Sequence, residues 1–163
     1  MPTPLKDTTK SDKTDTGSKS DVAQHLHKVV CTSYVLFAKT QGYHWNVVGP
    51  QFYSLHKMFE EQYNDLFLAI DELAERVRAL QSKAPFSLSE MLKTASIQEL
   101  PKIPNADEMV KDLIAGHESM VSDLKAGIEA AEAAKDDATA DLLTGRLEVH
   151  GKTLWMLRAT LQS

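Results

Sequence analysis

The residues of this sequence best suited to chemistry lie around one break in the chain. His44 and His56 flank Gly49-Pro50, and Glu60 follows His56 by one helical turn. Imidazole and carboxylate groups serve as proton acceptors and as metal ligands. Twelve residues of continuous helix would separate the two histidines by roughly 18 Å. Gly49-Pro50 instead predicts a turn that folds the chain back, so we expect the two rings to lie much closer together.

A second pair of candidate ligands lies further along the chain. Asp71 and Glu75 are four residues apart, so their side chains share one face of a helix. Two carboxylates placed in this way repel each other. Glu72 is an alternative on the outer face, and Arg76 could screen either carboxylate. The pair therefore has two interpretations, a solvated helix face or a set of metal ligands.

A single chain cannot bring the two pairs to one metal ion. His56 and Asp71 lie on the same predicted helix, roughly 22 Å apart, whereas metal–ligand distances are ~2 Å. If two copies pack with these helices antiparallel across a two-fold axis, the histidine end of one meets the carboxylate end of the other. Such ligands suit a divalent first-row metal such as iron, and open positions permit redox chemistry. The hypothesis is an inter-subunit metal site.

Helical periodicity predicts the elements that position these residues. Apolar side chains recur at helical spacing over residues 21–48, 50–82, 105–135 and 137–161. Ser20 or Asp21 is the expected N-cap of the first helix. The long connection before residue 105 contains a short helix, SLSEMLKTA, with a Ser87–Glu90 capping box. We therefore predict an all-α, ferritin-like four-helix bundle with a short helix in the crossover between helices two and three.

The usual di-iron site of such bundles is not expected. It lies inside one bundle and uses Glu-x-x-His motifs. The sequence contains no Glu-x-x-His, and Glu148-Val149-His150 has the wrong spacing to share a helix face.

Two domains of unequal kind are expected, a tail over residues 1–20 and the bundle domain over 21–163. The tail has almost no large apolar side chain, so it is predicted to be mobile. Its lysines (Lys6, Lys10, Lys13 and Lys19) invite a DNA-binding interpretation. Nearby aspartates (Asp7, Asp12, Asp15 and Asp21) offset them, and the whole chain carries −5. A solvated, near-neutral tail is the competing interpretation.

The compartment follows from what the sequence lacks. Cys31 is the only cysteine, so no intrachain disulfide can form, and its apolar setting predicts a buried, unreactive thiol. No apolar run approaches the ~18 residues of a membrane span, and no apolar signal segment opens the chain. We expect a cytoplasmic protein without membrane contact.

Two stretches carry a resemblance to a known family. HWNVVGPQFYSLHKMFEE and AIDELAERVRAL resemble the two signatures of the Dps family (DNA-binding proteins from starved cells), which are ferritin-like mini-cages. The short crossover helix and WMLRA near the C-terminus are also similar, and the resemblance covers about residues 21–161. It implies a shell of twelve copies that oxidises Fe(II), preferably with hydrogen peroxide, and stores ferric mineral inside, with nucleoid association if the tail binds DNA.

The same resemblance implies roles for individual residues. His44 and His56 of one subunit, with Asp71 and Glu75 of its two-fold mate, correspond to the ferroxidase ligands, with two iron positions at each site. Glu60 stands where many members carry Asp and corresponds to a ligand of the weaker position. Two further features have alternative roles. Trp45 matches an aromatic residue that absorbs stray oxidising equivalents, or it packs at the dimer interface. Acidic residues that open the last helix, including Asp136 and Asp137, line an iron-entry pore or compensate the helix dipole.

Overall fold

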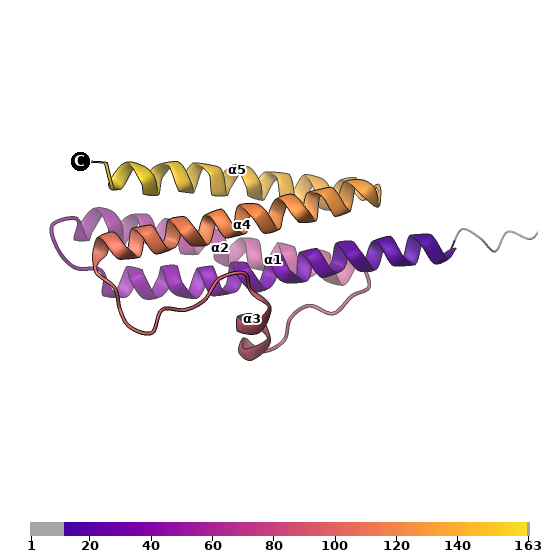
Figure 1. Ribbon diagram of the computed structural model, residues 1–163, viewed down its shortest axis with the longest axis horizontal. Helices are drawn as coiled ribbons and strands as arrows, with labels where there is room; N and C mark the ends of the chain where they lie inside the picture. The colour runs from indigo at the N-terminus through magenta and orange to yellow at the C-terminus, as the bar shows by residue number, and fades with distance from the viewer. Residues whose placement is uncertain (1–11, 163) are drawn as a thin grey trace, which may run out of the picture.

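A computed structural model describes residues 12–162. Its elements are α1 (Asp12–Asn46), α2 (Phe52–Ala79), α3 (Leu88–Thr94), α4 (Ala106–Ala133) and α5 (Asp137–Thr160). The four long helices lie side by side, and the crossover that carries α3 returns the chain along the bundle, so that α2 and α4 run in the same direction (Figure 1). This confirms the predicted all-α, ferritin-like bundle. Within residues 12–162, no helix is long and apolar enough to cross a lipid bilayer.

α1 begins at Asp12 rather than at Asp21, so the predicted N-cap at Ser20 or Asp21 is wrong. The helix continues into the expected tail and projects past the neighbouring helices (Figure 1). Extending an existing helix adds one hydrogen bond for each residue fixed, and is far easier than nucleating a new one. The remainder of the predicted mobile tail, residues 1–11, lies outside the described residues.

Two apolar clusters fill the bundle along its length. Buried members of the first include Leu36, Leu55, Phe59, Leu113 and Leu157, and those of the second include Leu26, Leu73, Leu124 and Leu143. Each such side chain contributes about 1.5–3 kcal/mol when it leaves water. Cys31 is buried in the first cluster, as predicted, and burial raises the pKa of its thiol to about 11. The reactive thiolate is therefore scarce at neutral pH.

Asp123 ties the crossover to the bundle. Its carboxylate accepts hydrogen bonds from the hydroxyls of Thr32 at 2.9 Å and Ser96 at 2.8 Å, and lies 3.1 Å from Lys28 Nζ. The predicted capping box of α3 is half formed. Ser87 Oγ accepts the Glu90 N–H, but the Glu90 carboxylate accepts the N–H of Phe86.

Asp136 caps α5 and connects it to α2. It accepts hydrogen bonds from the Thr139 N–H and hydroxyl, and its Oδ1 lies 2.7 Å from Arg76 Nη2. Burial raises the pKa of Asp136, but the Thr139 hydrogen bonds and the Arg76 charge outweigh it and hold the pKa below its usual value of 3.8. The stabilisation is therefore complete above pH 3.8 and is lost as the pH falls through the lowered pKa.

We expect Asp136→Ala to lower the free energy of unfolding by about 2 kcal/mol, because a helix cap and a charged hydrogen bond disappear together. Urea denaturation at matched protein concentration measures the loss. Asp136→Asn keeps an acceptor for the cap but loses the ion pair, so it should cost about half as much. Equal stability of Asp136→Ala and the wild type would contradict the assignment.

Candidate functional site

A tight reversal brings His44, in the last turn of α1, next to His56, in the first turns of α2. Gly49 lies in this reversal with φ of +108°. Residues with a side chain rarely adopt that conformation, so glycine allows the turn without strain. The imidazole rings stack with centroids 3.8 Å apart and planes 16° from parallel. The prediction that the chain break brings the two histidines together is confirmed.

The two histidines hold each other through crossed hydrogen bonds. His44 Nδ1 lies 2.8 Å from the carbonyl oxygen of His56, and His56 Nδ1 lies 2.9 Å from the carbonyl oxygen of His44. Because a carbonyl only accepts, each Nδ1 must carry the hydrogen and donate. In the neutral form of each ring, the lone pair therefore lies at Nε2. Metal-binding histidines are commonly oriented in this way, with one ring nitrogen donating and the other free to ligate.

Glu60 lies near this pair but is engaged with a neighbour. Its carboxylate lies 2.7 Å from Lys57 Nζ. The hydrogen bond and charge of Lys57 lower the pKa of Glu60, and the two histidines contribute to the same direction. To bind a metal ion, the Glu60 carboxylate must first release Lys57 from this exposed ion pair.

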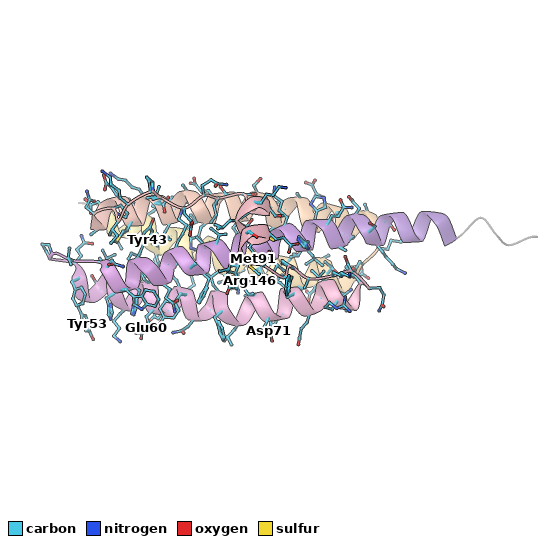
Figure 2. The ribbon with its side chains drawn as sticks, turned by 90° about the horizontal axis from the view of Figure 1, so that it is seen from below. Tyr43, Tyr53, Glu60, Asp71, Met91 and Arg146 are labelled. Carbon is cyan, nitrogen blue, oxygen red and sulfur yellow. The ribbon has the colours of Figure 1, made fainter. Side chains whose placement is uncertain are left out.

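Asp71 and Glu75 are exposed on α2 and, among the described residues, neither takes part in an ion pair. Glu60 and Asp71 lie along the same edge of α2 (Figure 2). Arg76 does not screen the two acids, because its guanidinium donates to Asp136 and to Thr139 Oγ1 at 2.8 Å. The interpretation of an Arg-screened face is therefore wrong.

A row of aromatic rings joins the histidine end to the acidic end. Ring centroids lie 5.2 Å apart for His44 and Tyr63, 6.1 Å for Tyr63 and Phe37, and 6.0 Å for Phe37 and Phe67. Phe67 then lines a groove of about 570 Å³ between α1 and α2, and Asp71 lies at the same groove. Tyr63 is not among the candidate residues predicted from the sequence. Its spacing of seven from His56, two helical turns, is the signal that places it on this face.

Several large apolar side chains are exposed at the end of α1 and along α2. Exposed fractions are 68% for Trp45, 73% for Tyr53, 62% for Phe67 and 66% for Leu68. Phe67 and Leu68 line the groove beside Asp71, and exposed apolar side chains that lie together are typical of an interaction surface.

The described residues of one chain do not form a complete metal site. Within the described range, no three His, Cys, Asp or Glu side chains converge as they would around a metal ion. His44 and His56 are brought together with Glu60 nearby, while Asp71 and Glu75 lie further along α2. The geometry leaves two groups of candidate ligands, one at each end of a partly apolar face.

Comparison with known proteins agrees with this architecture. Residues 23–163 match the model of the ferritin-like domain family, Ferritin. The chain is 41% identical over 140 residues to DNA protection during starvation protein 2 of Bacillus anthracis, an alignment that covers 86% of this chain and 96% of the relative.

Solved structures give the same result. Dps from Thermosynechococcus elongatus has a TM-score of 0.89 and 32% identity, covering 93% of this chain and 96% of its own. A DPS protein from Vibrio cholerae O1, described as a member of a broad superfamily of ferritin-like diiron-carboxylate proteins, has a TM-score of 0.86 and 33% identity, with coverage of 90% and 92%.

Proposed function

Because this chain belongs to the Dps proteins of the ferritin-like family, we propose that it oxidises Fe(II) with hydrogen peroxide or oxygen at sites shared by two copies. One observation carries the proposal. His44 and His56 keep free Nε2 atoms on a partly apolar face, while the unpaired acids of the same face are too distant to join them within one chain. A two-fold partner supplies what each half lacks.

Each shared site takes its ligands from two chains. His44 and His56 of one copy bind the Fe(II) substrate together with Asp71 and Glu75 of the other. Glu60 binds a second, weaker iron position after its carboxylate has left the ion pair with Lys57. Two Fe(II) ions each give one electron to hydrogen peroxide. The O–O bond breaks, two protons are taken up, and two water molecules and two Fe(III) ions result.

The assembly that fits this chemistry is a hollow shell of twelve copies that stores the ferric product as mineral. Two features of the chain support it. The face that carries the candidate ligands is partly apolar and exposed, which favours contact with another copy, and the net charge of −5 on each chain attracts Fe(II). Consuming peroxide and Fe(II) together would limit hydroxyl-radical formation and so protect the cell against oxidative damage.

The proposal predicts that His44→Ala/His56→Ala loses rapid Fe(II) oxidation while the particle persists. Removing two ligands should slow oxidation by at least about 100-fold, since loss of an outer-shell partner alone costs 10–100-fold. Absorbance of Fe(III) after stoichiometric peroxide measures the rate, and native mass spectrometry checks the assembly. If the wild-type particle oxidises iron no faster than buffer, the proposed activity is wrong.

DNA binding through residues 1–20 is a second candidate and stays a prediction. The N-terminal end of α1 projects beyond the other helices (Figure 1). Deleting residues 1–20 should abolish DNA retention at low salt and reduce the salt dependence, because all four tail lysines are removed. A gel-shift titration with salt measures this. Retention that is unchanged by the deletion would exclude the tail as the DNA contact.

A further inference from the structure

A largely buried cluster of polar side chains joins the end of α1 to α4. The Tyr43 hydroxyl donates a hydrogen bond to the Asp112 carboxylate of α4 at 2.5 Å, and Lys39 Nζ lies 2.8 Å from the same carboxylate. Tyr43 is 8% exposed, and the side chain of Lys39 is 7% exposed. Tyr43 lies toward the end of the bundle that also carries Tyr53 and Glu60 (Figure 2).

The crossover takes part in this cluster as well. Lys39 Nζ donates to the carbonyl oxygen of Gln98 at 2.7 Å, and Lys39 and Tyr43 lie one helical turn apart on the same face of α1. Hydrogen bonds with an ionised acceptor are roughly twice as strong as those between neutral groups. The Tyr43 hydroxyl is therefore held firmly by Asp112, whose charge is balanced by Lys39.

Tyr43 directly precedes His44, and both residues lie in the last turn of α1. The crossed hydrogen bonds of the two site histidines involve the backbone of this turn, because the carbonyl oxygen of His44 accepts from His56 Nδ1. The last carbonyls of a helix have no partner within it, and helix ends fray unless other groups hold them. A side chain fixed on α4 therefore determines the position from which His44 meets His56.

The backbone of Tyr43 also holds the start of the reversal. Its carbonyl oxygen accepts from the Val47 N–H at 2.9 Å. Metal ligands must be held within about 0.5 Å of their productive positions by the groups around them. The bond between Tyr43 and α4 supplies such a restraint, one residue away from His44.

We propose that Tyr43 and Asp112 are positioning residues for the metal ligand His44, an inference that rests on the function proposed above. The Tyr43 hydroxyl fixes the last turn of α1 against α4. This turn then keeps the crossed hydrogen bonds that leave the Nε2 atoms of His44 and His56 available to iron. Neither Tyr43 nor Asp112 is itself a ligand.

Tyr43→Phe removes the hydroxyl and keeps the ring in the core. Thr32→Val is the matched control, because Thr32 also donates from α1 to an aspartate of α4, Asp123, at 2.9 Å. In both variants the aspartate keeps its lysine. Thr32 lies twelve residues before His44, roughly 18 Å along the helix. Native mass spectrometry checks that each full-length variant assembles as the wild type does.

Hydrogen–deuterium exchange tests whether the hydroxyl anchors the helix end. The peptide that contains Val47 should exchange about tenfold faster in Tyr43→Phe, because the last turn of α1 opens more often once its bond to α4 is lost. Thr32→Val should leave the exchange of this peptide unaltered.

Titration with Co²⁺ tests the consequence for metal binding without any oxidation of iron. Co²⁺ binds the same imidazole and carboxylate donors, and its visible absorption reports the binding. The wild type should give an absorption band that is lost in His44→Ala/His56→Ala. Tyr43→Phe should raise the dissociation constant measured from this band about tenfold, as changes to the outer-shell partners of metal ligands do. Thr32→Val should bind Co²⁺ as the wild type does.

Three results would overturn the inference. Unchanged exchange at Val47 in Tyr43→Phe would show that the hydroxyl does not hold the helix end. Faster exchange with unaltered Co²⁺ affinity would show that the anchor does not position His44. Equal weakening of Co²⁺ binding in Thr32→Val would assign the loss to general stability. A wild-type band that survives in His44→Ala/His56→Ala would contradict the metal site of the proposed function instead, and exchange at Val47 would still decide whether Tyr43 anchors α1.

Discussion

A shell reassembled from equal amounts of His44→Ala and Asp71→Ala subunits should recover roughly a quarter of the wild-type rate of Fe(II) oxidation, although each variant alone has lost it. The reason is the division of ligands between two copies. Random assembly makes half of the two-fold pairs mixed. In a mixed pair, one site receives both defects and the other receives none, so one site in four is complete.

The measurement compares peroxide-driven Fe(II) oxidation by the mixed shell, by each variant and by reassembled wild type. A mixture of His44→Ala with His56→Ala is the matched control, because both defects fall on the histidine half of every site and no pairing repairs them. Equal rates in the two mixtures, with twelve-subunit particles confirmed by native mass, would contradict shared ligation. The ligand sets would then have to work within one chain.

Replacing Phe67 by aspartate should prevent assembly and abolish iron oxidation while leaving the bundle folded. Phe67 is 62% exposed and lines the groove beside Asp71, so the folded chain tolerates a charge there. In the assembled protein, the same charge would be buried without a partner, which costs several kcal/mol. We expect the dissociation constant of the two-fold pair to rise at least ~100-fold. Both ligand sets would remain intact, but on separate chains.

Analytical ultracentrifugation and far-UV circular dichroism separate association from folding in this experiment. Phe67→Leu is the control, since it keeps an apolar side chain in the groove and should assemble and oxidise iron normally. Twelve-subunit particles of Phe67→Asp with normal activity would show that this face is not the contact that completes the site.

The periodicity of the sequence was sufficient to predict the bundle. Leu55, Phe59, Leu66, Leu73 and Val77 recur at helical spacing and are all buried in α2. The break at Gly49-Pro50 was sufficient to predict that His44 and His56 approach each other. These features are local, because the spacing along a helix alone determines which side chains share a face. The separation of the acids from the histidines follows from helix rise in the same way.

Contacts between helices were decided only by the tertiary structure. Arg76 lies one residue after Glu75 yet pairs with Asp136 of the turn before α5, because that partner is packed against it. The crossed hydrogen bonds of His44 and His56 depend equally on how α1 and α2 meet. Sequence spacing contains no information about such pairings across helices.

The polar interior was visible in the sequence only in part. Arg146 and His150 lie on the same face of the last helix as Leu143 and Leu154, so their burial could have been predicted from spacing. Spacing could not predict that His150 contacts His117, or that the side chain of Gln62 has no hydrogen-bond partner among the described residues. Both depend on where three helices converge. The spacing of residues along one helix shows which of them share a face, but not which side chains of other helices they contact.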